Sequence, residues 1–177
     1  MENQIPVSGS QFSAVIVIVM GVEGSGKTTV GALLAQELGW EFADADSFHS
    51  PENIEKIRRG IPLNDADRAP WIEAMRKAIV RWIGDRRNAV LACSALKRAY
   101  RERLWVGPEV KLVYLKGTFE LIAQRLKARH GHFAGEQILT SQFADLEEPQ
   151  DEAAVTVDVS HTPEQLVAEI ETQLKLA

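Results

Sequence analysis

The residues that most clearly indicate a chemical function form a glycine-rich run near the start of the chain. Residues 21–28 read Gly-Val-Glu-Gly-Ser-Gly-Lys-Thr, which matches the pattern of Gly, four residues, Gly, Lys and then Ser or Thr. The glycines allow backbone N–H groups to converge on phosphate oxygens at the start of a helix. We expect Lys27 to reach the β- and γ-phosphates of ATP, and the Thr28 hydroxyl to ligate Mg²⁺.

The nucleotide-binding residues predicted from this motif form one continuous stretch. They are Gly21, Val22, Glu23, Gly24, Ser25, Gly26, Lys27, Thr28 and Thr29. A glycine turn with an exposed lysine is the alternative, and the apolar strand before the motif and the amphipathic pattern after it argue against that alternative. The acidic side chain of Glu23 is expected to point away from the phosphates.

Two carboxylates follow the second apolar segment. Asp44 and Asp46 alternate along the chain, so both side chains leave the strand end on one side, toward the edge where ligands of open α/β sheets bind. We expect Asp44 to serve Mg²⁺ and Asp46 to orient a substrate hydroxyl and accept its proton. Capping of a loop is the alternative function for both.

A polar turn and a pair of arginines complete the chemistry-bearing groups. Residues 60–71 include Asn64, Asp67 and Arg68, which suit recognition of a polyol and a carboxylate but equally suit a capped loop. Arg125 and Arg129 lie four apart on a helical pattern and could clamp the transferring phosphoryl group, or form a solvated helix end. The glycine-flanked segment after them is typical of a mobile lid.

The elements that must position these groups alternate between strand and helix patterns. The uninterrupted apolar run at residues 14–20 indicates a strand buried on both faces of a parallel sheet. Further strands are expected at residues 40–43, 89–93, 111–115 and 154–159. Helices are expected after the glycine-rich run, ending at Gly39, and after the capping residues Ser50 and Thr162. The fold class is therefore α/β.

The end of the third strand lacks an expected acidic residue. A conventional nucleotide hydrolase carries a metal-binding Asp there, whereas this chain has Cys93 and Ser94. The metal role therefore shifts toward Asp44, and a motor, GTPase or transporter ATPase is disfavoured. Cys93 is expected to be a buried packing residue.

Composition limits the remaining function classes. With 177 residues, of which 45% are hydrophobic, we expect a flexible segment at 1–13 and a single domain at 14–177. The formal charge of -5 disfavours nucleic acid as a partner. No apolar run approaches the roughly 18 residues of a membrane helix, and one cysteine in an apolar segment suits a reducing compartment. We therefore expect a cytoplasmic protein without a membrane partner.

Together these motifs resemble the gluconate kinase family, over residues 17 to about 149. The segments that carry the resemblance are Met20–Thr28, Asp44–Asp46 with His49 and Asn53, Gly60–Trp71, Leu91–Lys97 with Tyr100 and Arg101, Arg125–Phe133, and Ser141–Phe143 with Leu146 and Glu147.

The resemblance implies the three-layer P-loop kinase fold, with a five-stranded parallel sheet flanked by helices and a mobile lid at about 125–149. It implies ATP- and Mg²⁺-dependent phosphorylation of D-gluconate to 6-phospho-D-gluconate by a cytoplasmic homodimer. Catalytic roles then fall on Lys27, Asp46, Arg125 and Arg129. Substrate-binding roles fall on Asp46, His49, Asn64, Asp67, Arg68, Lys97, Arg101 and His132.

Three rival functions use the same phosphate loop. A kinase acting on shikimate or a nucleoside monophosphate is disfavoured by the Pro-Leu-Asn-Asp run at residues 62–65. A non-catalytic ATP-binding switch and a nucleic-acid end kinase are disfavoured by the paired aspartates and the acidic charge balance. The sequence therefore favours a sugar-acid kinase.

Overall fold

The structure is a computed structural model that describes residues 13–130, 134–150 and 152–176. The described strands are β1 (Ile16–Met20), β2 (Glu41–Asp44), β3 (Ala89–Ala92), β4 (Val110–Lys116) and β5 (Ala154–Asp158). The described helices are α1 (Lys27–Leu38), the 3-10 turn η1 (Ala45–Phe48), α2 (Pro51–Arg58), α3 (Asp65–Gly84), α4 (Arg98–Leu104), α5 (Phe119–His130), α6 (Ala134–Asp145) and α7 (Pro163–Leu174).

The strands form one parallel sheet in the order β2-β3-β1-β4-β5. The central strand β1 pairs with β3 on one side and with β4 on the other. Because all strands run in one direction, the segments that follow them emerge at the same edge of the sheet. The five-stranded parallel sheet expected from the sequence is confirmed.

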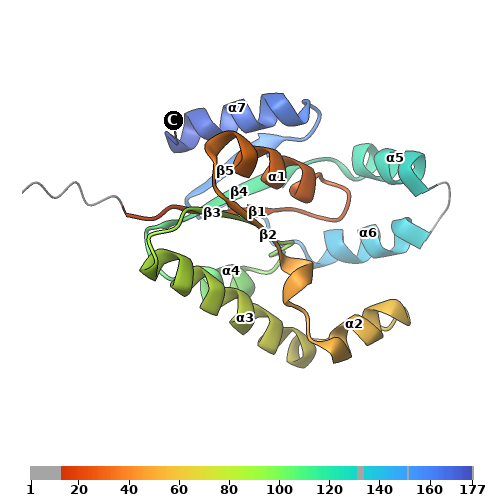
Figure 1. Ribbon diagram of the computed structural model, residues 1–177. Helices are drawn as coiled ribbons and strands as arrows, with labels where there is room; N and C mark the ends of the chain where they lie inside the picture. The colour runs from red at the N-terminus through yellow and green to blue at the C-terminus, as the bar shows by residue number, and fades with distance from the viewer. Residues whose placement is uncertain (1–12, 131–133, 151, 177) are drawn as a thin grey trace, which may run out of the picture.

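Helices cover both faces of the sheet. Figure 1 shows α1 and α7 above it and α3 and α4 below it. Alternate residues of β1 enter two separate apolar clusters: Val17 and Val19 pack with the α1 and α7 side, while Ile16 and Ile18 pack with the α3 side. All five β1 residues are buried, which explains why its sequence is uninterrupted by polar residues.

The local signals for helix ends are confirmed with small shifts. Gly39 ends α1 with a left-handed φ of 67°. Trp40 lies outside β2 because its N–H bonds to the Ala35 carbonyl at the end of α1, so β2 begins one residue later than expected. Ser50 and Thr162 each accept a backbone hydrogen bond as N-caps.

The N-terminal segment and the possibility of a membrane-crossing helix complete the description of the fold. Of the expected N-terminal segment at 1–13, all but Ser13 lies outside the described residues. Among the helices that the structure describes, none combines the length and the apolar character needed to cross a bilayer.

Candidate active site

The glycine-rich run forms a loop between β1 and α1. Gly24 and Gly26 adopt positive φ values of 77° and 97°, which L-residues with side chains rarely adopt. A Cβ atom at Gly24 would lie 2.8 Å from Leu126 Cγ of α5, so this glycine also permits the loop to approach the helix. The loop backbone therefore curls back over the N-terminus of α1, as phosphate binding requires.

Lys27 lies in the first turn of α1 and folds back onto the loop. Its Nζ donates to the Val22 carbonyl at 2.9 Å. Burial lowers the pKa of Lys27, and the carboxylates of Glu23, Asp46 and Asp44 oppose that shift. A cation whose hydrogen-bond partner in the described structure is one neutral carbonyl can exchange that partner for a phosphate.

Thr28 and Asp44 meet at the junction of the loop and β2. The Thr28 hydroxyl donates to Asp44 Oδ2 at 2.8 Å, and Asp44 Oδ1 accepts from the Asp46 N–H at 3.0 Å as the cap of η1. A hydroxyl beside a carboxylate fits Mg²⁺, which favours oxygen ligands and keeps several waters and phosphate oxygens. Within the described residues, no group of three or more His, Cys, Asp or Glu side chains is placed to hold a metal ion.

Ser25 supplies a second observation that suits phosphate. Its side chain is 1% exposed, and its hydroxyl lacks a hydrogen-bond partner in the described structure. A buried polar group without a partner is costly in folded proteins and is often found at functional sites. The loop and Ser25 together therefore fit a nucleotide phosphate.

The segment after β2 carries Asp46 and His49 toward α3. Asp46 is exposed, and His49 stacks on Trp71 with ring centroids 4.6 Å apart. Trp71 is itself fixed by a hydrogen bond of 2.7 Å from its Nε1 to the Ala45 carbonyl. Burial, with a smaller contribution from Arg68, lowers the pKa of His49, while Asp46 opposes the shift. His49 is therefore favoured in its neutral form, which can both donate and accept hydrogen bonds.

Asn64 and Asp67 form the capping box of α3. The Asn64 side chain accepts from the Asp67 N–H at 2.8 Å, and the Asp67 carboxylate accepts from the Asn64 N–H at 3.1 Å. Lys56 of α2 adds an ion pair of 2.6 Å to Asp67, and Asn53 donates to the Asp67 carbonyl. Asn64 and Asp67 therefore act as helix caps, which is the alternative that the sequence left open for them. The contacts of Lys56 and Asn53 with Asp67 hold α2 against α3.

Arg68 and Lys97 converge on one carboxylate from different elements. Asp65 lies 3.8 Å from Arg68 and 3.4 Å from Lys97, and it accepts a hydrogen bond of 2.5 Å from the Tyr100 hydroxyl. Two cations share this one carboxylate at distances longer than a tight ion pair, so either can turn toward a second carboxylate. The cluster can therefore receive the carboxylate of a small acid.

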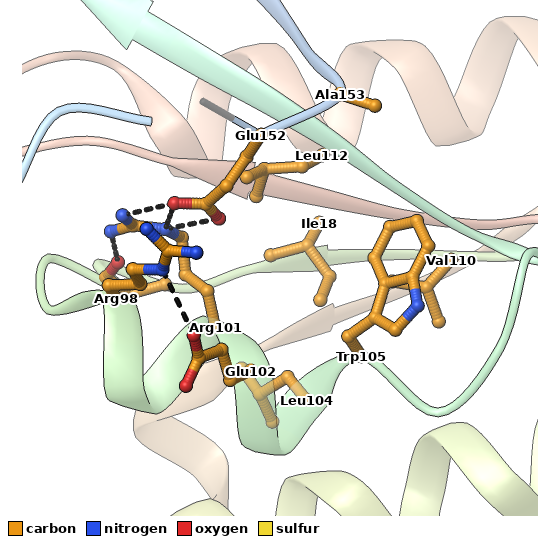
Figure 2. A pocket seen from close by; sticks show the side chains of 11 residues that line it. Ile18, Arg98, Arg101, Glu102, Leu104, Trp105, Val110, Leu112, Glu152 and Ala153 are labelled. Carbon is orange, nitrogen blue, oxygen red and sulfur yellow. Dashed lines mark hydrogen bonds and ion pairs between the residues drawn. The ribbon is translucent and has the colours of Figure 1, made fainter. Parts of the chain in front are cut away.

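Arg101 does not join that cluster. Its guanidinium donates to both oxygens of Glu152 and to the Ala95 and Leu96 carbonyls, and the residue is 5% exposed. Figure 2 shows Arg101 directed at Glu152, with the neighbouring pair of Arg98 and Glu102. Its hydrogen bonds instead fix the segment that leads from β3 to Lys97.

The cavity drawn in Figure 2 is separate from the phosphate loop. It encloses about 240 Å³ against α4, β1 and β4, and its apolar walls include Ile18, Leu112 and Trp105. None of the residues of the phosphate loop lines this cavity. We therefore assign the candidate site to the edge of the sheet.

The two arginines expected in the lid lie on α5. Arg125 donates to the Val159 carbonyl at 2.5 Å, beyond the end of β5, and Arg129 is exposed. Among the described residues, no hydrogen bond or ion pair joins either arginine to the phosphate loop. His132 lies outside the described residues.

Two contributors were missing from the sequence-based set of site residues. Tyr100 lies three residues after Lys97, a helical spacing that could have placed it beside that lysine. Gln142 of α6 accepts a hydrogen bond of 2.6 Å from the Glu23 N–H of the phosphate loop. The separation of 119 residues leaves no local signal for that contact.

Comparison with known proteins gives consistent similarities over most of the chain. The family model for shikimate kinase matches residues 23–175. A probable gluconokinase of Rattus norvegicus is 45% identical over 76% of this chain and 83% of that protein. The thermoresistant gluconokinase of Escherichia coli is 44% identical over 86% of this chain and 89% of that protein. The crystal structure of a gluconokinase from Sinorhizobium meliloti has a TM-score of 0.82 at 40% identity, covering 93% of each chain.

Proposed function

Because the chain belongs to the gluconokinase family, we propose that it transfers the γ-phosphoryl group of ATP to D-gluconate and forms 6-phospho-D-gluconate. The observation that carries the proposal is a contact at the edge of the sheet. Thr28 of the phosphate loop bonds to Asp44, two residues before Asp46. The side chains proposed to bind the nucleotide phosphates and the acceptor hydroxyl therefore lie next to each other.

On the nucleotide side, the loop N–H groups and Lys27 hold the phosphates. Lys27 leaves the Val22 carbonyl and neutralises charge that develops on the transferring group. Thr28 and, through water, Asp44 would hold Mg²⁺, which neutralises the β- and γ-phosphates when bound. Arg125 and Arg129 approach the phosphates when the lid at 125–149 closes and excludes water.

On the acceptor side, Asp46 orients the terminal hydroxyl of gluconate and accepts its proton. Arg68 and Lys97 bind the substrate carboxylate, since they lie 3.8 Å and 3.4 Å from Asp65 and can exchange that long contact for a second carboxylate. His49, Asn64 and the lid residue His132 contact the remaining hydroxyls. Asp67 and Arg101 support the site by holding the Asn64 cap and the segment before Lys97.

The enzyme is further proposed to act in the cytoplasm as a homodimer. The buried free Cys93 suits a reducing compartment, and family resemblance supports the dimer. Analytical ultracentrifugation at micromolar concentration tests the assembly, and a species with the mass of a single chain would contradict it.

An acceptor panel tests the function. ADP release with Mg-ATP is measured against gluconate, other sugar acids, neutral sugars, shikimate and nucleoside monophosphates. We expect gluconate to give the highest kcat/KM by at least about tenfold, because a site built for a carboxylate and several hydroxyls rejects ligands that lack them. A higher kcat/KM with any other acceptor would overturn the substrate assignment.

The role of Asp46 is tested by Asp46→Asn, with Asp85→Asn at the C-cap of α3 as the matched control. General-base catalysis contributes about 10² to 10⁴ in rate. We therefore expect kcat to fall by about 10² or more in the first variant and to be unchanged in the control. Near-wild-type kcat in Asp46→Asn would exclude Asp46 as the base.

A further inference from the structure

A single peptide unit of the phosphate loop is held from both ends. The carbonyl of Val22 accepts from Lys27 Nζ at 2.9 Å and, within the turn, from the Ser25 N–H at 3.2 Å. The N–H of Glu23, which belongs to the same peptide plane, donates to Gln142 Oε1 at 2.6 Å. The lysine and Gln142 together therefore fix the orientation of the peptide between Val22 and Glu23.

Gln142 reaches the loop from the packed face of α6. Leu139, three residues earlier, is fully buried in the core cluster that also contains Ile122 and Leu126 of α5. Phe143 packs edge-on against Phe119 with ring centroids 5.5 Å apart. The same α5 side chains, Ile122 and Leu126, adjoin Gly24 of the loop. Both partners of the hydrogen bond are thus held by one packed unit.

This arrangement becomes asymmetric when the nucleotide binds. Lys27 is required at the phosphates, so the Val22 carbonyl gives up its ammonium partner. The contact from the Gln142 side chain then remains, together with the longer backbone bond from the Ser25 N–H. Without Gln142, the only described contact that opposes rotation of this peptide is the backbone bond of 3.2 Å from the Ser25 N–H, and a rotation that turns the electronegative carbonyl toward the phosphates disfavours ATP binding.

We propose that Gln142 is a positioning residue that holds the peptide between Val22 and Glu23 in the phosphate-binding orientation. This inference rests on the proposed kinase function, because it assigns Lys27 to the phosphates of ATP. Loss of Gln142 lowers the fraction of molecules with a competent loop, and the apparent ATP affinity falls by that fraction. At saturating ATP, where the loop is held in its competent form, the KM for gluconate is unaffected.

The test compares Gln142→Met with Gln124→Met on the exposed face of α5. Methionine retains the length and packing of glutamine but cannot replace the amide oxygen as an acceptor. We expect the ATP Kd and the KM for ATP to rise by about fivefold in Gln142→Met, which corresponds to one hydrogen bond. The KM for gluconate stays within about twofold, and Tm stays close to that of the control.

Two results would overturn the proposal. One is an ATP Kd in Gln142→Met within twofold of that in Gln124→Met. The other is an equal rise of both KM values together with a lower Tm, which would mean that Gln142 only stabilises the fold. Because ATP Kd is measured by calorimetry without an acceptor, the role of Gln142 is decided even if the wild-type enzyme does not phosphorylate gluconate.

Discussion

Two buried or half-buried cations in this molecule are held in opposite ways. Lys27 donates to one backbone carbonyl in the described part of the chain, and burial lowers its pKa. Arg101 bonds to a carboxylate and two carbonyls. A lysine ammonium can exchange one partner for another, whereas a guanidinium in which all three nitrogens donate hydrogen bonds is fixed. Lys27 can therefore move from the carbonyl to a substrate phosphate, whereas Arg101 stabilises the fold.

The structural role of Arg101 is tested through its partner Glu152. Glu152→Gln leaves the guanidinium, whose side chain is 4% exposed, without its counter-charge. The free energy of unfolding should fall by about 3 kcal/mol, measured by urea denaturation. Glu102→Gln is the matched control, because that glutamate pairs with Arg98 of the same helix but is 63% exposed. It should change stability by less than about 1 kcal/mol.

The opposite pattern would contradict this role. If Glu152→Gln were as stable as Glu102→Gln but raised the KM for gluconate by about a hundredfold, Arg101 would be a substrate ligand after all. Its sequence position could not distinguish the two roles. The distinction depends on Glu152, which is 51 residues away in the chain.

Cys93 gives a prediction for pH dependence. Burial raises the pKa of its thiol from 9.0 to about 12, and the residue is 2% exposed. Because the thiolate is the reactive form, only about one molecule in 10⁴ carries it at pH 8. Iodoacetamide should therefore leave the native protein unlabelled at pH 8 and label it in urea. Rapid labelling of the native protein, followed by mass spectrometry, would show that the thiol is accessible.

At the scale of the elements, local signals were sufficient wherever the cause was local. The apolar run of β1, the left-handed Gly39 and the Thr162 cap all depend on neighbouring residues, and the sequence predicted each of them. The contact of Gln142 with the phosphate loop depends on how α6 packs against α5, so it could not be predicted. The role of Asn64 remained ambiguous for a different reason: an asparagine side chain can serve equally well as a helix cap or as a substrate ligand.

That ambiguity can be resolved by comparing two capping boxes in the same chain. Asn64→Ala and Thr162→Ala each remove the N-cap side chain of a helix. Each substitution should lower the free energy of unfolding by about 1 kcal/mol, which corresponds to a fall in Tm of about 2–4 °C. Only Asn64→Ala should also raise the KM for gluconate, because only the Asn64 amide is proposed to contact a hydroxyl of the substrate. Equal KM values in both variants would remove Asn64 from the acceptor site.

At the scale of the whole molecule, the segment from α6 to β5 connects the two halves of the site. Gln142 contacts the phosphate loop. Five residues later, Glu147 donates through its N–H to the Leu96 carbonyl and accepts from the Arg98 N–H, which fixes the segment before α4. Figure 1 shows α6 beside α5 at the end of the sheet where these loops lie. A shift of α6 on nucleotide binding would therefore reach Lys97.

This connection predicts coupling between the two substrates. A non-hydrolysable ATP analogue should tighten gluconate binding by about fivefold or more, and gluconate should tighten binding of the analogue by the same factor. Glu147→Ala removes the side-chain bond to Arg98, so it should bring that factor close to one while the analogue still binds alone. Glu120→Ala, at an exposed position of α5, is the control and should retain the coupling. Calorimetric titrations with and without the second ligand measure all four affinities. If Glu147→Ala retained the wild-type factor, the link would run through the direct contact between Thr28 and Asp44 and not through α6.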